Sequence, residues 1–108
     1  EMVVKKHGFT KEQLDQFSFE SHQKAKAATD AGLFAGEILS LEIDTPEGKA
    51  MHSIDEGIRM DATLEGIAGV KLLQEGGTIT AASSSQICDG ASAVLIVSEQ
   101  ALKDHGLT

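Results

Sequence analysis

One stretch of the sequence constrains the fold more than any other. Residues Ala91–Val97 are apolar at every position except Ser92. Such a run is typical of a β-strand covered on both faces, because a strand with one solvated face would alternate apolar and polar residues. Ser98, directly after the run, can cap a helix, and Gly106 can end that helix. A buried strand followed by a helix predicts an α/β architecture.

A long helix is predicted nearer the start of the chain. Thr10 and Gln13 have the spacing of a capping box, in which each side chain binds the backbone N–H of the other residue. Apolar and small side chains then recur at helical spacing, and Gly32 is a natural helix stop. The pattern predicts a helix over Lys11–Ala31. Its stripe consists of Leu14, Phe17, Ser21, Ala25 and Ala28.

The middle of the chain is less regular. Residues Glu37–Ile43 roughly alternate and predict a short extended segment. The only proline, Pro46, stands in a turn signal with Glu47 and Gly48. Residues Lys49–Met60 are polar and irregular, which fits either a loop or a frayed edge strand.

A short helix and another strand are predicted next. Asp61 or Thr63 can cap the helix, although Gly66 and Gly69 weaken it by roughly 1 kcal/mol each relative to alanine. Thr78–Ala82 has strand character, and a run of serines then ends it. The apolar side of the short helix consists of Leu64, Ile67 and Val70.

Composition excludes several classes of function. The 108 residues carry a formal net charge of −8 and 4% aromatic residues, with no tryptophan or tyrosine. A nucleic-acid partner calls for a basic face, and single strands also call for aromatic stacking surfaces. Cys88 is the only cysteine, which excludes an internal disulfide and a cysteine-rich zinc site. The apolar runs are far shorter than the roughly 20 residues of a membrane span. We expect a cytoplasmic protein without a metal, nucleic-acid or membrane partner.

Three features could carry chemistry. Arg59 is the only arginine, and its flat guanidinium can stack on rings and bind phosphate. The hydroxyl and N–H groups of Ser83–Ser85 could hold a phosphate or an amide, or they could simply form a polar turn. Cys88 could act as a nucleophile if a base formed its thiolate, but the negative charge of Asp89 disfavours the thiolate. A structural cysteine and a surface arginine are the simpler alternatives.

Three longer segments share their pattern with one family. Within Glu75–Glu99, Gly-Thr-Ile-Thr-Ala-Ala-Ser-Ser-Ser precedes Asp-Gly-Ala-Ser-Ala and an apolar run. Asp55–Glu65 begins Asp-Glu-Gly-Ile-Arg and ends Ala-Thr-Leu-Glu, and Thr10–Ala25 carries Asp-Gln-Phe-Ser-Phe-Glu-Ser. These segments resemble, in the same order, motifs of the thiolases, which are acyl-CoA acyltransferases. The resemblance covers nearly the whole chain and implies a fragment of the thiolase fold, with helices and a few strands of a mixed sheet.

The resemblance implies an activity and a binding site. Thiolases carry acyl groups between coenzyme A and a cysteine thiolate, making or cleaving 3-oxoacyl-CoA. By this resemblance Arg59 lies against the adenine end of coenzyme A, and Ser85 touches the pantetheine arm. Ala81 and Ala82 would line the same channel. The chain departs from the family where Ala82-Ser83 replaces the common Gly-Asn, so the local turn can differ there.

The resemblance also implies that the catalytic residues lie outside these 108 residues. The family's acylated cysteine and its Gly-His-Pro, Asn-Glu-Ala-Phe and Cys-x-Gly-Gly elements have no counterpart in this sequence. Residues 1–75 would belong to the family's loop domain, and residues 76–108 would be the closing strands and helix of its N-terminal core domain. The expected partners are an acyl-CoA substrate, the remainder of a thiolase chain and further copies in a homo-oligomer.

A second function stays open at this stage. A thiolase-like segment could bind CoA esters, or pair with a partner chain, without catalysis. The net charge of −8 opposes attraction of polyanionic coenzyme A over long distances. Binding would therefore depend on local cations, and Arg59 and Lys71 are the best placed in the sequence.

Overall fold

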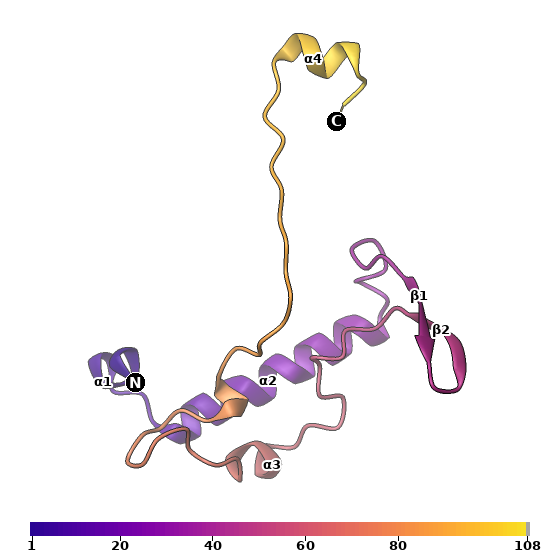
Figure 1. The fold of residues 1–108 in the computed structure, drawn as a ribbon. Helices are drawn as coiled ribbons and strands as arrows, with labels where there is room; N and C mark the ends of the chain where they lie inside the picture. The colour runs from indigo at the N-terminus through magenta and orange to yellow at the C-terminus, as the bar shows by residue number, and fades with distance from the viewer. Residues whose placement is uncertain (108) are drawn as a thin grey trace.

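The computed structural model describes residues 1–107, whose helices and hairpin spread along an elongated body (Figure 1). The extents of the molecule are 59 × 43 × 26 Å. The helix α2 runs across the lower part of the molecule in Figure 1, and a β-hairpin lies beyond its C-terminal end. The elements in chain order are α1 (Met2–His7), α2 (Lys11–Asp30), β1 (Leu41–Thr45), β2 (Gly48–His52), α3 (Leu64–Ala68), the 3-10 helix η1 (Ala81–Ser83) and α4 (Glu99–Asp104).

The long helix α2 confirms the sequence prediction. Gln13 N donates to Thr10 Oγ1 at 3.3 Å, and Thr10 N donates to Gln13 Oε1 at 2.9 Å, which completes the capping box. Such a cap stabilises a helix by about 1 kcal/mol. The helix ends at Asp30, and Gly32 then adopts a positive φ of 69°. Glycine allows this left-handed turn at low cost because it has no Cβ.

The chain returns along α2 after the hairpin, and both α3 and η1 pack against that helix. Ile67 of α3 is the buried apolar residue of this contact, with 7% of its surface exposed. Lys11 Nζ donates to Asp15 Oδ2 at 2.6 Å and to Ala68 O at 2.9 Å, which ties the end of α3 to the start of α2. Thr63 caps α3 by accepting from the backbone N–H of the third helical residue. The cap is therefore Thr63, one of the two predicted residues.

The β-hairpin is antiparallel and partly predicted. Leu41 pairs with His52 and Thr45 pairs with Gly48, so the register is fixed by the tight turn at Pro46-Glu47. Strand β1 starts later than the extended segment predicted over residues 37–43. For the segment predicted over residues 49–60, β2 confirms the edge-strand alternative as far as His52, and residues 53–60 form a loop, the other alternative.

The strand predicted at Thr78–Ala82 is wrong. Only Thr80 pairs, in an isolated bridge to Leu72, and a 3-10 turn follows. Ser83 Oγ accepts from Thr80 N at 3.0 Å, and Ser84 Oγ donates to Thr80 O at 2.7 Å. These hydroxyls bind the backbone groups that a sheet ladder would need, which explains why pairing does not extend beyond Thr80.

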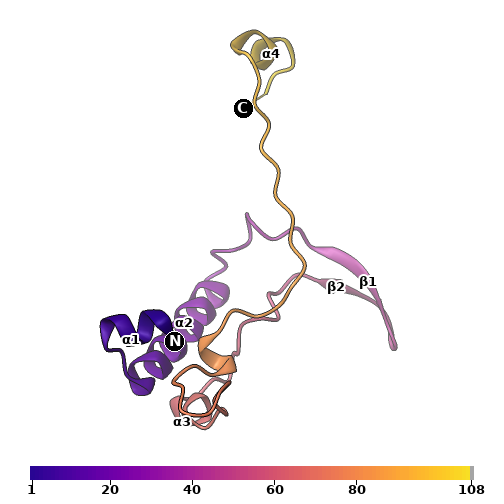
Figure 2. The same ribbon diagram turned by 60° about the vertical axis from the view of Figure 1, so that its left-hand side comes forward.

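The buried strand predicted at Ala91–Val97 is also not formed among the described residues. This segment runs away from the body and is exposed, with Val94 at 87% and Ile96 at 89% of their surface accessible (Figures 1 and 2). No strand within residues 1–107 lies beside it to complete a ladder. The helix α4 that follows is capped by Ser98 at 3.2 Å, as predicted.

The start of the chain is tied to the segment before η1 by one carboxylate. Glu1 Oε1 accepts from Thr78 N at 2.8 Å and from Ile79 N at 3.0 Å, and Thr78 Oγ1 donates to Glu1 Oε2 at 2.9 Å. The backbone bond from Thr78, followed by that from Ile79, lowers the pKa of Glu1 below its ordinary value of 4.5. Hydrogen bonds to the ionised form favour that form.

This link predicts a pH response. Because the folded pKa of Glu1 is lowered, its contribution to stability is complete above the unfolded pKa and is lost as the pH falls through the folded value. In an NMR titration, the amide protons of Thr78 and Ile79 should shift together with a midpoint below 4.5. Glu1→Gln should remove the shift, and a midpoint at or above 4.5 would contradict the link.

The contact between Lys11 and Asp15 predicts an asymmetric loss of stability. Lys11→Met keeps helix propensity but leaves the Asp15 carboxylate, 3% exposed, without its cation. We expect a loss of about 1–3 kcal/mol in urea unfolding. The matched control is Lys24→Met, which breaks an exposed pair with Glu20 and should cost at most about 0.5 kcal/mol. Equal losses in the two variants would show that the Lys11 contact is not special.

Candidate functional site

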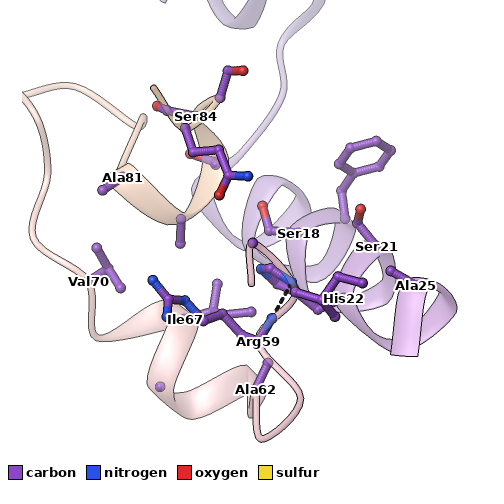
Figure 3. Close-up of a pocket in the computed structure, with 18 of the residues that line it drawn as sticks. Ser18, Ser21, His22, Ala25, Arg59, Ala62, Ile67, Val70, Ala81 and Ser84 are labelled. Carbon is purple, nitrogen blue, oxygen red and sulfur yellow. Dashed lines mark hydrogen bonds between the residues drawn. The ribbon is translucent and has the colours of Figure 1, made fainter. Parts of the chain in front are cut away.

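A cleft of about 960 Å³ opens between α2, the loop before α3, α3 itself and the segment from η1 to residue 86 (Figure 3). These walls come from three separate parts of the sequence. They meet because the chain from residue 59 to residue 68 returns antiparallel to α2 and is bonded to it along its length. The cleft therefore depends on tertiary contacts and not on one local motif.

The wall from α2 is the stripe predicted from helical spacing. Leu14, Phe17, Ser21 and Ala25 of that stripe line the cleft. Ser18 and His22 also line it and were missed by the sequence analysis. Helical spacing could have predicted both, because Ser18 lies four residues after Leu14 and His22 lies four residues after Ser18, on the same face of the helix.

The loop before α3 is held to α2 through its backbone. Arg59 N donates to His22 Nδ1 at 3.2 Å, shown as the dashed line in Figure 3. Lys26 Nζ donates to Met60 O at 3.0 Å. The Arg59 side chain lines the cleft and is exposed, and no salt bridge within residues 1–107 engages its guanidinium. This leaves a cation available at the edge of the cleft.

The structure brings all four predicted binding residues to this cleft. Arg59 lies on the loop before α3, Ala81 and Ala82 lie on η1, and Ser85 follows η1. Their roles toward a ligand remain predictions. Lys71, the other cation considered in the sequence, is not among the residues that line the cleft.

The serine run divides into two kinds of residue. Ser83 and Ser84 bond their hydroxyls to the backbone of Thr80, so these two residues shape the turn. Within residues 1–107, no protein hydrogen bond engages the hydroxyl of Ser85, which also lines the cleft. The turn thus includes Ala82-Ser83, where the sequence departs from the thiolase pattern, and Ser84 stabilises it. The hydroxyl of Ser85 is left to face solvent or a ligand.

Gln86 also lines the cleft and was not predicted. Its amide lies against Gly57, where an added Cβ would stand 2.3 Å from Gln86 Nε2. Asp55 Oδ1 accepts from Gly57 N at 2.8 Å and fixes that turn. The absence of a side chain at Gly57 therefore permits the close approach of the two segments.

The remaining candidate, Cys88, is exposed and is not among the residues that line the cleft. Residues 1–107 contain no group of three or more histidine, cysteine, aspartate or glutamate side chains placed to hold a metal ion. Among the helices of that part of the chain, none is long and apolar enough to cross a membrane.

The described residues form helices, one antiparallel hairpin and a cleft, and comparison with known proteins gives the family. The family described as "Thiolase, N-terminal domain" matches residues 1–100. The chain therefore belongs to the thiolase N-terminal domain family, as the motifs in its sequence predicted.

Two curated relatives show how far the similarity extends. The steroid 3-ketoacyl-CoA thiolase FadA6 of Mycobacterium tuberculosis is 45% identical over 107 residues, which are 99% of this chain and 25% of that protein. The mitochondrial 3-ketoacyl-CoA thiolase of Homo sapiens is 38% identical over 109 residues, covering 100% of this chain and 28% of that protein. The chain spans about a quarter of the length of these relatives.

Solved structures agree with this assignment. The crystal structure of human mitochondrial 3-ketoacyl-CoA thiolase superposes with a TM-score of 0.85 at 38% identity, over 98% of this chain and 27% of that one. The acetyl-CoA acetyltransferase of Syntrophomonas wolfei gives a TM-score of 0.64 at 34% identity, over 72% of this chain and 20% of that one. The α/β fold class predicted from the sequence is confirmed as a part of the thiolase fold.

Proposed function

We propose that this chain is the CoA-binding segment of a thiolase that makes or cleaves 3-oxoacyl-CoA through a cysteine acyl-enzyme. The observation that carries the proposal is one cleft that holds both the guanidinium of Arg59, which has no salt bridge, and the hydroxyl of Ser85, which has no protein hydrogen bond, within residues 1–107. These two groups differ in the chemistry that they can bind.

The chemistry of coenzyme A suits this pair of groups. Its adenine and phosphates offer a flat ring and negative charge, which a planar, permanently charged guanidinium can stack on and pair with. Its pantetheine arm carries amides that the Ser85 hydroxyl can bond. The methyl groups of Ala81 and Ala82 leave room beside that path. At about 960 Å³, the cleft lies near the upper end of the range of small-molecule sites.

The overall charge makes Arg59 more important to this proposal. With a net charge of −8, the chain repels a polyanion over long distances. Since Lys71 does not line the cleft, attraction at short range falls to Arg59.

We assign the catalytic nucleophile, base and oxyanion-stabilising groups to parts of a thiolase chain outside these 108 residues. Acyl transfer requires an activated nucleophile beside a base and donors aimed at the developing oxyanion. Cys88 does not line the cleft, and Asp89 follows it directly. In this proposal residues 1–75 form part of the loop domain and residues 76–108 close the N-terminal core domain. Ala91–Val97 then completes a sheet with strands of the remaining chain.

The location and assembly of the protein are part of the same proposal. We expect a cytoplasmic homo-oligomer, although the human relative is named as mitochondrial. Mass measurement of the native particle and fractionation of cells test these two expectations.

The alternative function is a thiolase-like module that binds CoA esters or mediates oligomerisation without catalysis. None of the residues that line the cleft is a cysteine, and this favours a site that binds without catalysis. Two measurements separate these functions: calorimetric titration of the chain with CoA measures binding, and an assay of the chain mixed with the remaining part of a thiolase measures activity. Activity in the mixture supports the enzyme, and binding without any activity supports the module.

The proposed role of Arg59 predicts a selective kinetic effect. In a full-length thiolase carrying this chain, Arg59→Ala should raise KM for acyl-CoA by about tenfold because it removes a charge-assisted contact. The value of kcat should change little, since the residue binds far from the reacting thioester. The control Lys24→Ala removes one positive charge from the exposed surface of α2 and should leave both constants unchanged.

An unchanged KM in the Arg59→Ala variant would overturn the adenine-end assignment. A fall in kcat with KM unchanged would also contradict it, because that pattern belongs to a group that acts only in the transition state.

The chain by itself should not turn over substrate. Purified residues 1–108 mixed with acetoacetyl-CoA and CoA should show no consumption of acetoacetyl-CoA above the buffer rate, because the proposed nucleophile lies elsewhere. Turnover by this chain alone would refute that placement of the catalytic groups.

A further inference from the structure

The loop that carries Arg59 has no regular secondary structure, and side chains of α2 hold it by its backbone (Figure 3). Three side chains of α2 make these contacts, and they lie within about one turn of the helix: His22, Gln23 and Lys26. The bonds are Arg59 N to His22 Nδ1 at 3.2 Å, Lys26 Nζ to Met60 O at 3.0 Å and Gln23 Nε2 to Ala62 O at 3.5 Å.

The bond between Arg59 N and His22 differs in direction from the other two. Lys26 and Gln23 donate to carbonyl groups, whereas His22 accepts, and it accepts from the backbone N–H of Arg59 itself. An imidazole nitrogen that accepts a hydrogen bond carries no proton, so the neutral ring has its proton on Nε2. The bond holds the peptide plane before Arg59 and so restrains the backbone from which the Arg59 side chain extends.

We propose that His22 is a positioning residue for Arg59. By holding the Arg59 N–H, His22 keeps the guanidinium at the edge of the cleft before a ligand arrives. A loop that is held in place before binding loses less conformational entropy on binding, so affinity rises without a new contact. This inference rests on the proposed function of Arg59 in binding the adenine end of acyl-CoA.

Two conservative substitutions separate positioning from simple packing. His22→Asn can place its Oδ1 near the position of Nδ1, so it keeps an acceptor for Arg59 N while removing the ring. His22→Gln places its amide near the position of Nε2 and leaves the place of Nδ1 empty. A role in packing would favour the longer glutamine, and a role in positioning would favour the shorter asparagine.

The test measures KM and kcat for acyl-CoA in a full-length thiolase carrying this chain. His22→Gln should raise KM about fivefold, the effect expected for one neutral hydrogen bond, with kcat unchanged. His22→Asn should stay within about twofold of the parent protein. In an Arg59→Ala background, His22→Gln should have no further effect, because a residue acting through Arg59 loses its role when that side chain is absent.

The outcomes distinguish this inference from the proposed function. If Arg59→Ala leaves KM unchanged, the proposed function fails. If Arg59→Ala raises KM but His22→Gln does not, the positioning role alone is wrong. Equal effects of His22→Gln in both backgrounds would show that the ring acts on the ligand or on packing independently of Arg59, which also overturns the inference.

A spectroscopic measurement tests the bond without kinetics. The imidazole ¹⁵N shifts of His22 in the neutral ring should show a protonated Nε2 and an unprotonated Nδ1. The opposite tautomer would exclude the bond from Arg59 N and with it the positioning role.

Discussion

The candidate site depends on polar contacts between side chains of α2 and the backbone of the chain that returns along it. Lys11 binds the end of α3, while His22 and Lys26 bind the loop before that helix. Only Ile67 contributes a buried apolar side chain among the described residues, so apolar packing alone cannot fix the loop. The long, capped helix therefore acts as the rigid support, and the cleft forms where the returning chain is bonded to it.

Local signals predicted the local structure well. The capping box at Thr10 and Gln13, the cap at Thr63 and the helix after Ser98 each depend on residues within four positions, and all are present. The strand predicted at Thr78–Ala82 failed because neighbouring serine hydroxyls bind the backbone of Thr80. Ala91–Val97 failed for a different reason, since a strand needs partners that residues 1–107 do not supply.

The candidate site was predicted in composition but not in geometry. Arg59, Ala81, Ala82 and Ser85 were chosen from motifs far apart in the sequence, and the structure places them around one cleft. The contact between His22 and Arg59 could not be predicted, because it joins residues 37 positions apart through a backbone N–H that carries no sequence signal. Membership of the thiolase N-terminal domain family explains why the motifs occur together.

We propose that this cleft binds coenzyme A through Arg59 at one end and Ser85 along its path. The decisive experiment is a crystal structure of a full-length thiolase carrying this chain, in complex with CoA. We predict the adenine ring against the guanidinium of Arg59, with the pantetheine arm passing Ala81 and Ala82 toward Ser85. CoA bound elsewhere on the protein, with this cleft filled only by water, would exclude the cleft as the coenzyme A site.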